Sequence, residues 1–335
     1  MPHSATILGC EGLRLGASER AFFRDADPWG FILFARNIES PDQIRRLTGD
    51  LREAVGREAL ITIDQEGGRV QRLRPPHFRD WLPPLDQMDR TAPEARERAV
   101  WLRYRLIAAE LRSVGIDSDC APSADIAVEG THPFLKNRCF GRDLDSVTRA
   151  ARACAEGLLA GGVVPIMKHM PGHGRGTMDS HLELPRVDAD AETLQQSDFA
   201  AFRVLNDLPV GMTAHIVYSA FDDRPTTQSA RLLGLIRDEI GFQGLLVTDD
   251  LSMEALSGSL SDRAGRSIAA GCDIALYCKG VRAESQAVVT AAGALTAAAT
   301  LRADQALARR HPPEPIDRAR LEAEFESLMQ GRGHV

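Results

Sequence analysis

Asp249 ends an apolar run, Leu245–Asp249, that reads as a strand buried on both faces. A carboxylate in that position could attack the anomeric carbon of a sugar as a nucleophile. The same residue type also caps helices, so Asp249 or Asp250 could instead cap a helix that begins near Ser252. We favour the capping interpretation more for Asp250 than for Asp249.

Asp179 and His181 lie two positions apart in a glycine-rich segment, and in an extended chain such side chains share a face. A neighbouring carboxylate raises the pKa of an imidazole and fixes its tautomer, which makes a usable general acid and base. Most pairs with this spacing are simply solvated loop residues. Gly172, Gly174 and Gly176 nevertheless fit a loop that must bend or move.

Three histidines in this region could be metal ligands instead, namely His169, His173 and His181. Their spacing matches no dense ligand motif such as H-E-x-x-H. The ammonium group of the adjacent Lys168 would also repel a cation. We therefore expect neither a bound metal ion nor another cofactor.

Several charged residues elsewhere suit a sugar, which presents many hydrogen-bond donors and acceptors and little apolar surface. They are Asp64, Arg72, Arg138, Lys168 and His169. Each could equally form an ion pair between neighbouring loops, and Glu66 and Arg69 are interpreted as such internal structure. Aromatic residues make up only 5% of the chain, so a broad platform for long polysaccharides is not expected.

These candidates need a scaffold that brings the ends of several strands together. Eight runs rich in Val, Ile and Leu read as buried strands. They are Ala5–Gly9, Gly30–Phe34, Ala59–Asp64, Asp117–Ala121, Val163–Lys168, Val210–Ala214, Leu245–Asp249 and Cys272–Cys278. Polar residues follow the third, fifth, sixth and seventh runs, and the active site of a (β/α)8 barrel lies at the C-terminal ends of its strands.

Helical patterns lie between these runs. The apolar residues from Val100 to Val114 recur at intervals of four and three, and Gly115 follows as a C-terminal cap. Ser40 and Gln43 flank Pro41 as a capping box would. Further helices are expected near 144–160, 191–206, 229–240, 254–270 and 282–299. This alternation fits a closed barrel or an open doubly wound sheet, which periodicity alone does not separate.

The division of the chain follows from its length and composition. A chain of 335 residues fits one (β/α)8 domain, expected over 1–310. Pro312 and Pro313 mark a break, and Asp317–Met329 reads as a final helix. The segment 311–335 is therefore a helical tail expected to pack on or near the barrel.

Charge and targeting signals exclude several classes of function. The net charge of -7 argues against nucleic-acid binding, and the run Ala287–Thr300 is too short to span a bilayer. The N-terminal residues lack the basic and apolar regions of a signal peptide. Six scattered cysteines suggest buried free thiols rather than a disulfide framework. We expect a cytoplasmic monomer that binds neither membranes nor nucleic acid.

Several longer strings are similar to those of a known family. They are ITIDQEGGRVQRL from Ile61, KHMPGHGRGTMDSHLELP from Lys168, GMTAHIVYSAFDDRPTTQS from Gly211, LLVTDDLSMEAL from Leu245, GFILFARNIESPDQIRRL from Gly30 and NRCFGRD from Asn137. Together they resemble the bacterial β-N-acetylhexosaminidases of glycoside hydrolase family 3, from about residue 7 to about residue 280. The string from Lys168 is long enough to make the resemblance specific.

The resemblance implies a single (β/α)8 TIM barrel and a retaining mechanism with Asp249 as nucleophile. It implies that His181 is the acid/base, assisted by Asp179 on a mobile loop. The positions that bind N-acetylglucosamine are matched by Asp64, Arg72, Arg138, Lys168 and His169. The implied substrate is N-acetylglucosamine β-linked to anhydro-N-acetylmuramic acid on recycled muropeptides.

The chain departs from the family pattern at two places, and other functions stay open. The segment Arg175–Met178 has no assigned counterpart, and Tyr277–Gly280 reads YCKG where the family is closer to VCNN. These differences affect the expected preference for the leaving group rather than the chemistry. The alternatives are a sugar phosphorylase with the same site, a metal-dependent hydrolase and a barrel that binds muropeptide without cleaving it.

Overall fold

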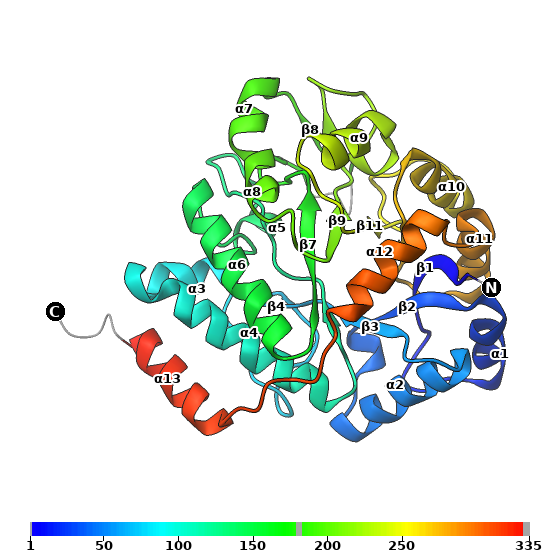
Figure 1. The fold of residues 1–335 in the computed structure, drawn as a ribbon, viewed down its shortest axis with the longest axis horizontal. Helices are drawn as coiled ribbons and strands as arrows, with labels where there is room; N and C mark the ends of the chain where they lie inside the picture. The colour runs from blue at the N-terminus through cyan, green and yellow to red at the C-terminus, as the bar shows by residue number, and fades with distance from the viewer. Residues whose placement is uncertain (1, 179–182, 331–335) are drawn as a thin grey trace.

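The computed structural model describes residues 2–178 and 183–330, and these ranges contain an eight-stranded parallel barrel (Figure 1). Its strands are β1 (Ser4–Gly9), β2 (Pro28–Leu33), β3 (Leu60–Ile63), β6 (Ser118–Asp119), β7 (Val164–Met170), β9 (Val210–Thr213), β11 (Leu245–Asp250) and β12 (Ile274–Tyr277). Each predicted strand is present. The sheet order β3-β2-β1-β12-β11-β9-β7-β6 follows the chain around the barrel.

Two backbone hydrogen bonds close the barrel between β3 and β6. The Asp117 amide donates to the Ile61 carbonyl at 3.1 Å, and the Cys120 amide donates to the Ile63 carbonyl at 2.8 Å. An open doubly wound sheet has two free edges and lacks such bonds. The (β/α)8 prediction is therefore confirmed.

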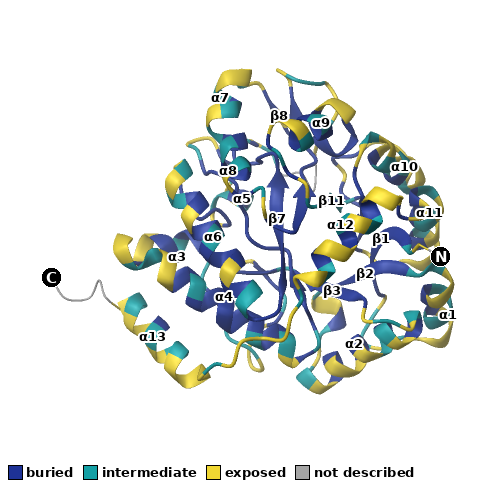
Figure 2. Ribbon diagram, in the orientation of Figure 1, coloured by how far each residue is buried: buried dark blue, intermediate teal, exposed yellow. Residues whose placement is uncertain are grey.

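Helices surround the barrel and bury its strands (Figure 2). They are α1 (Ala17–Ala26), α2 (Pro41–Val55), α3 (Pro84–Arg90), α4 (Arg96–Ser113), α5 (Pro133–Lys136), α6 (Leu144–Ala160), α7 (Ala191–Gln196), α8 (Asp198–Val204), α9 (Ala230–Asp238), α10 (Leu260–Ala270), α11 (Arg282–Ala292), α12 (Ala297–Ala308) and α13 (Arg318–Gln330). No helix in the described part of the chain is long and apolar enough to span a membrane. All six cysteines are buried free thiols, as predicted.

The predicted caps of α2 and α4 are present, with one change of partner. The Ser40 hydroxyl accepts the Gln43 amide at 3.3 Å, but the Gln43 side chain accepts the Glu39 amide at 2.9 Å rather than that of Ser40. Gly115 ends α4 with φ at 80°, and a Cβ there would stand 2.4 Å from the Thr48 hydroxyl. Glycine is therefore required at this position.

Three predicted helices have different bounds. The expected helix 191–206 is interrupted at Ser197, where ψ of -82° separates α7 from α8. The expected helix 254–270 begins only at Leu260, after a capping box between Ser259 and Asp262. The expected helix 282–299 ends at Ala292, because Gly293 adopts φ of 68°.

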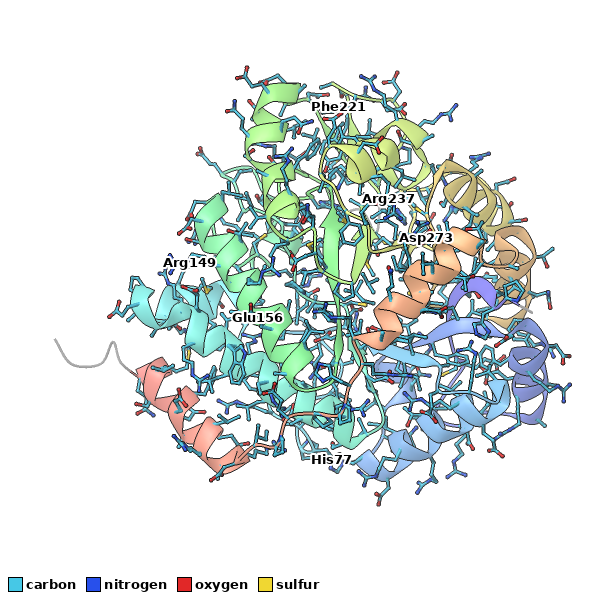
Figure 3. The ribbon with its side chains drawn as sticks, viewed as in Figure 1. His77, Arg149, Glu156, Phe221, Arg237 and Asp273 are labelled. Carbon is cyan, nitrogen blue, oxygen red and sulfur yellow. The ribbon has the colours of Figure 1, made fainter. Side chains whose placement is uncertain are left out.

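An ion-paired cluster joins elements at the barrel end opposite the site described below. Asp273, which precedes β12, binds Arg237 at 2.8 Å and also pairs with Arg302 of α12 (Figure 3). Its Oδ2 atom also accepts the Leu246 amide of β11 at 2.9 Å. This buried carboxylate therefore stabilises the start of two strands and the helices around them.

The final helix α13 packs beside α4. Arg98 of α4 forms an ion pair with Glu324 at 2.7 Å, and the rings of Trp81 and Phe325 meet edge to face with centroids 5.5 Å apart. Trp81 follows a hairpin of β4 (Gln65–Gly67) and β5 (Val70–Gln71), which the sequence did not predict. The Gly68 amide donates to the Trp81 carbonyl at 2.7 Å, so α13 supports this hairpin through one indole ring. The boundary at residue 310 remains a proposal.

Candidate active site

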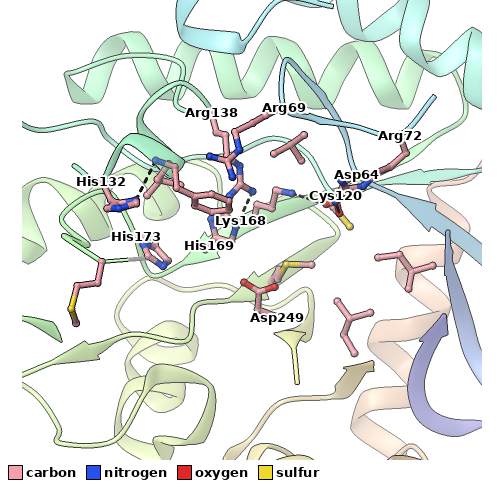
Figure 4. Close-up of a pocket in the computed structure, with 17 residues that line it drawn as sticks. Asp64, Arg69, Arg72, Cys120, His132, Arg138, Lys168, His169, His173 and Asp249 are labelled. Carbon is pink, nitrogen blue, oxygen red and sulfur yellow. Dashed lines mark hydrogen bonds and ion pairs between the residues drawn. The ribbon is translucent and has the colours of Figure 1, made fainter. Parts of the chain in front are cut away.

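A cavity of about 380 Å³ lies at the C-terminal ends of the strands (Figure 4). Six predicted site residues line it, namely Asp64, Arg72, Arg138, Lys168, His169 and Asp249. They come from β7, β11 and the segments that follow β3 and β6. A closed parallel barrel brings these strand ends to one rim, which explains how residues far apart in the sequence share one cavity.

Asp249 lies at the end of β11, is half-buried and lines the cavity. Its Oδ1 atom accepts the Asp250 amide at 2.8 Å. Asp250 instead shapes the next turn, because its carboxylate accepts the Ser252 amide at 3.0 Å and the Ser252 hydroxyl at 2.6 Å. The prediction of a helix that begins near Ser252 is wrong, because the next helix begins at Leu260. The contacts nevertheless agree with the expectation that Asp250, rather than Asp249, shapes the backbone that follows.

Two carboxylates, the half-buried Asp64 and the buried Glu66, hold three cations that line the cavity. Asp64 accepts Arg72 at 2.9 Å and Lys168 at 3.0 Å. Glu66 binds Arg138 through both oxygens, at 2.8 and 2.9 Å, and also pairs with Lys168. Burial alone would raise the pKa of Glu66, but the charges of Arg138 and Lys168 outweigh it and lower the pKa to about 2.

This network fixes the charges of the site before any ligand binds. Burial would lower the pKa of Lys168, but Glu66 and Asp64 keep it above its ordinary value, so the ammonium stays charged. The donors of Arg72, Arg138 and Lys168 are therefore held in fixed positions along the cavity. Glu66 is internal structure as predicted, and its partners are Arg138 and Lys168.

Removing the Glu66 carboxylate should weaken the fold. The Glu66→Ala variant leaves the buried Arg138 guanidinium without its counter-ion, so the free energy of unfolding should fall by about 3–5 kcal/mol. Urea denaturation followed by circular dichroism measures the change. The matched variant Glu324→Ala removes the carboxylate of an exposed ion pair and should cost at most about 1 kcal/mol. Equal losses in the two variants would contradict the role given to Glu66.

Asp125, a residue that the sequence analysis missed, orients His169. Its Oδ2 atom lies 2.7 Å from His169 Nδ1, and its Oδ1 atom accepts the His173 amide at 2.6 Å. The other imidazole nitrogen, Nε2, lies 3.3 Å from Arg138 Nη2. A guanidinium can only donate, so Nε2 accepts and Nδ1 carries the proton toward Asp125. The sequence could have indicated Asp125 as a site residue, because it follows the end of the fourth predicted strand by four residues.

The histidines do not form a metal site with other described residues. Within residues 2–178 and 183–330, no three His, Cys, Asp or Glu side chains are grouped as metal ligands. Both ring nitrogens of His169 already face protein partners. Burial and the neighbouring His169 lower the pKa of His173 to about 4, so its ring is neutral near pH 7.

Two of the predicted catalytic residues, Asp179 and His181, lie outside the described residues. Met178 immediately precedes them in the chain and lines the cavity. The roles assigned to Asp179 and His181 therefore remain predictions. Arg69, interpreted from the sequence as internal structure, is instead exposed and lines the cavity, so that interpretation is wrong.

Asp119 of β6 makes the stability depend on pH. Burial raises its pKa to about 8, and its Oδ2 atom has no hydrogen-bond partner among the described residues. The folded chain thus keeps a proton that the unfolded chain releases, so this contribution is present below about pH 4 and lost as the pH rises through about 8. The Asp119→Asn variant cannot ionise and should lose less stability across this range, by on the order of a few kcal/mol. Denaturation at several pH values measures the slopes, and parallel curves for both proteins would contradict the assignment.

The chain is similar to known proteins in sequence and in fold. A sequence profile for the glycosyl hydrolase family 3 N terminal domain matches residues 14–309. A protein named Beta-hexosaminidase from Methylococcus capsulatus is 40% identical over 272 residues, which cover 80% of each chain. Another of that name from Alkalilimnicola ehrlichii is 38% identical, over 81% of this chain and 80% of its own length.

Two solved structures share this architecture. Native NagZ from Neisseria gonorrhoeae superposes with a TM-score of 0.84 at 29% identity, covering 98% of this chain and 96% of that one. A family 3 β-N-acetylglucosaminidase from Paenibacillus superposes with a TM-score of 0.86 at 27% identity, covering 97% of this chain and 67% of that one. The agreement therefore extends over nearly the whole of the described fold.

Proposed function

The chain belongs to glycosyl hydrolase family 3, and on that premise we propose that it is a retaining exo-β-N-acetylglucosaminidase acting on muropeptides. It is a glycoside hydrolase of the β-hexosaminidase type. The observation that carries the proposal is the position of Asp249 in one cavity with five side chains suited to sugar hydroxyls. The cavity of about 380 Å³ is near the lower limit for ligand sites, which suits one terminal sugar.

The proposed reaction is a double displacement. Asp249 attacks the anomeric carbon and forms a covalent glycosyl-enzyme, while His181 donates a proton to the departing oxygen. Asp179 orients the His181 imidazole. His181 then takes a proton from water, which attacks the same carbon and releases the sugar with its configuration retained. Asp64, Arg72 and the residues around them fix the sugar ring during both steps.

Hydrolysis and phosphorolysis differ in the molecule that attacks the glycosyl-enzyme. An imidazole base is neutral, so it does not repel a phosphate ion as a carboxylate base would. We expect 4-nitrophenyl N-acetyl-β-glucosaminide to release nitrophenol steadily in phosphate-free buffer. Adding phosphate should leave N-acetylglucosamine as the product. Release only after phosphate is added, with a sugar phosphate as product, would favour the phosphorylase instead.

The natural substrate proposed is N-acetylglucosamine β-linked to anhydro-N-acetylmuramic acid, as it occurs in peptidoglycan recycling. The match to β-hexosaminidases over about four fifths of the chain supports it. We propose that the protein acts as a monomer in the cytoplasm, where recycled muropeptides are degraded. Mass spectrometry of a muropeptide digest tests the substrate: loss of one N-acetylhexosamine from each disaccharide peptide is the expected result.

A further inference from the structure

The mechanism leaves one histidine of the cavity wall without a role. His173 lines the cavity together with His169, and the two rings meet edge to face with centroids 5.7 Å apart (Figure 4). Both ring nitrogens of His169 face protein partners, Asp125 and Arg138. The Nδ1 atom of His173, by contrast, is buried and has no hydrogen-bond partner among the described residues. Its Nε2 atom also forms no hydrogen bond with them, but it is not enclosed as Nδ1 is, so it is open to the cavity.

The His173 ring is held in a fixed orientation. The His173 amide donates to Asp125 Oδ1 at 2.6 Å, and the Gly176 amide donates to the His173 carbonyl at 2.9 Å. Gly176 also lies against the ring, since a Cβ added there would stand 2.7 Å from Nδ1. Only 5% of His173 is exposed, so little side-chain entropy remains to be lost when a ligand binds.

These surroundings determine which ring nitrogen of His173 carries the proton. Burial and the neighbouring His169 lower the pKa of His173 to about 4, so the ring holds a single N–H group near pH 7. An enclosed N–H group without an acceptor is more costly than an enclosed lone pair without a donor. The proton is therefore on Nε2, and the ring directs a neutral hydrogen-bond donor into the cavity.

We propose that His173 binds the terminal sugar of the substrate by donating from Nε2 to one of its hydroxyl oxygens. This inference rests on the proposed function and adds a substrate-binding residue to it. The other donors, on Arg72, Arg138 and Lys168, are charged and already paired with carboxylates. Asp249 lies within electrostatic range of His173. A neutral donor suits a site near this nucleophile, because a cation there would pair with the carboxylate that must attack.

The test is a double-mutant cycle between the side chain and the sugar. It compares 4-nitrophenyl N-acetyl-β-glucosaminide, the parent glycoside, with its 3-deoxy, 4-deoxy and 6-deoxy derivatives. In His173→Leu, kcat/KM for the parent glycoside should fall by about three- to tenfold, as expected for one neutral hydrogen bond. For the derivative that lacks the partner hydroxyl, the same substitution should change kcat/KM by less than about twofold. His173→Gln, which keeps an N–H donor, should retain most of the activity.

Two controls separate this contact from a structural role and from an acid–base role. His77 is exposed and lies outside the cavity (Figure 3), so His77→Leu should leave every rate unchanged. The pH profile of kcat/KM should keep the same limbs in His173→Leu, because the ring stays neutral above about pH 5. Equal losses for all four glycosides, or the disappearance of one limb, would overturn the proposal.

Calorimetric titration with N-acetylglucosamine distinguishes this proposal from the proposed function. If the unaltered protein binds the sugar but fails to cleave the parent glycoside, the proposed function is wrong. The same cycle, measured in Kd with the deoxy sugars, then decides whether His173 binds a hydroxyl. If the protein neither binds the sugar nor cleaves the glycoside, both proposals fail.

Discussion

The Asp249→Ala variant is expected to lose hydrolysis of 4-nitrophenyl N-acetyl-β-glucosaminide by on the order of 10⁴-fold or more in kcat. The carboxylate that forms the covalent intermediate is gone, and Asp250 does not replace it, because its oxygens accept the Ser252 amide and hydroxyl. The cavity itself should persist, since the ion pairs of Asp64 and Glu66 do not involve position 249. The initial rate of nitrophenol release is the measurement.

Azide separates a missing nucleophile from a damaged fold. A small anion can occupy the space left by the side chain and attack the anomeric carbon, giving a glycosyl azide of inverted configuration. We expect azide to restore part of the activity of Asp249→Ala and to leave that of the unaltered protein nearly unchanged. A thermal unfolding curve close to that of the unaltered protein is the structural control. Near-normal hydrolysis by folded Asp249→Ala would rule out this residue as the nucleophile.

The His181→Ala variant is expected to show a loss that depends on the leaving group. General acid catalysis contributes about 10²–10⁴-fold, and the need for it disappears when the leaving group is already a stable anion. Hydrolysis of the natural type of disaccharide should therefore fall by about 10³-fold, while a 2,4-dinitrophenyl glycoside should be cleaved at a nearly unchanged rate of glycosylation. A series of aryl glycosides of increasing phenol pKa measures the dependence.

The pH profile provides the second readout for His181. In the unaltered protein, kcat/KM for a disaccharide should fall as the acid/base loses its proton, and this alkaline limb should be absent in the variant. The Asp179→Asn variant should shift the limb to lower pH, because the carboxylate that stabilises the charged imidazole is removed. Equal losses for good and poor leaving groups would show that His181 has a structural role instead.

The parts of the fold that were predictable from sequence are those with strong local patterns. All eight strands were found because a strand buried on both faces gives an almost continuous apolar run. Closure of the barrel could not be predicted from local patterns, because it depends on long-range hydrogen bonds from Asp117 and Cys120 to β3. The hairpin of β4 and β5 was missed because its two strands contain only five residues and two adjacent glycines, a pattern that reads as a loop.

For the site as well, local sequence patterns were predictable and long-range contacts were not. Asp249 and the residues that share its cavity could be predicted to lie together because they are polar residues in distinctive strings at the ends of strands. The function of Asp125 was hidden because an isolated aspartate in a loop has many possible partners, and only the fold brings it to His169. The prediction that Arg69 is internal structure was wrong because the hairpin, which was not predicted, turns the Arg69 side chain to the Phe134 ring and the Glu66 side chain to Arg138.

The contact between Phe325 and Trp81 has a consequence for interpreting genetic variation in this protein. The same tryptophan bonds through its carbonyl to Gly68 and through its amide to Gln71, at 2.7 and 3.0 Å, and these residues flank Arg69. A premature stop codon or missense change near codon 325 would leave every barrel strand intact. It would nevertheless loosen the hairpin that presents Arg69 and Arg72 to the sugar, so a cell carrying it would show the phenotype of a substrate-binding lesion.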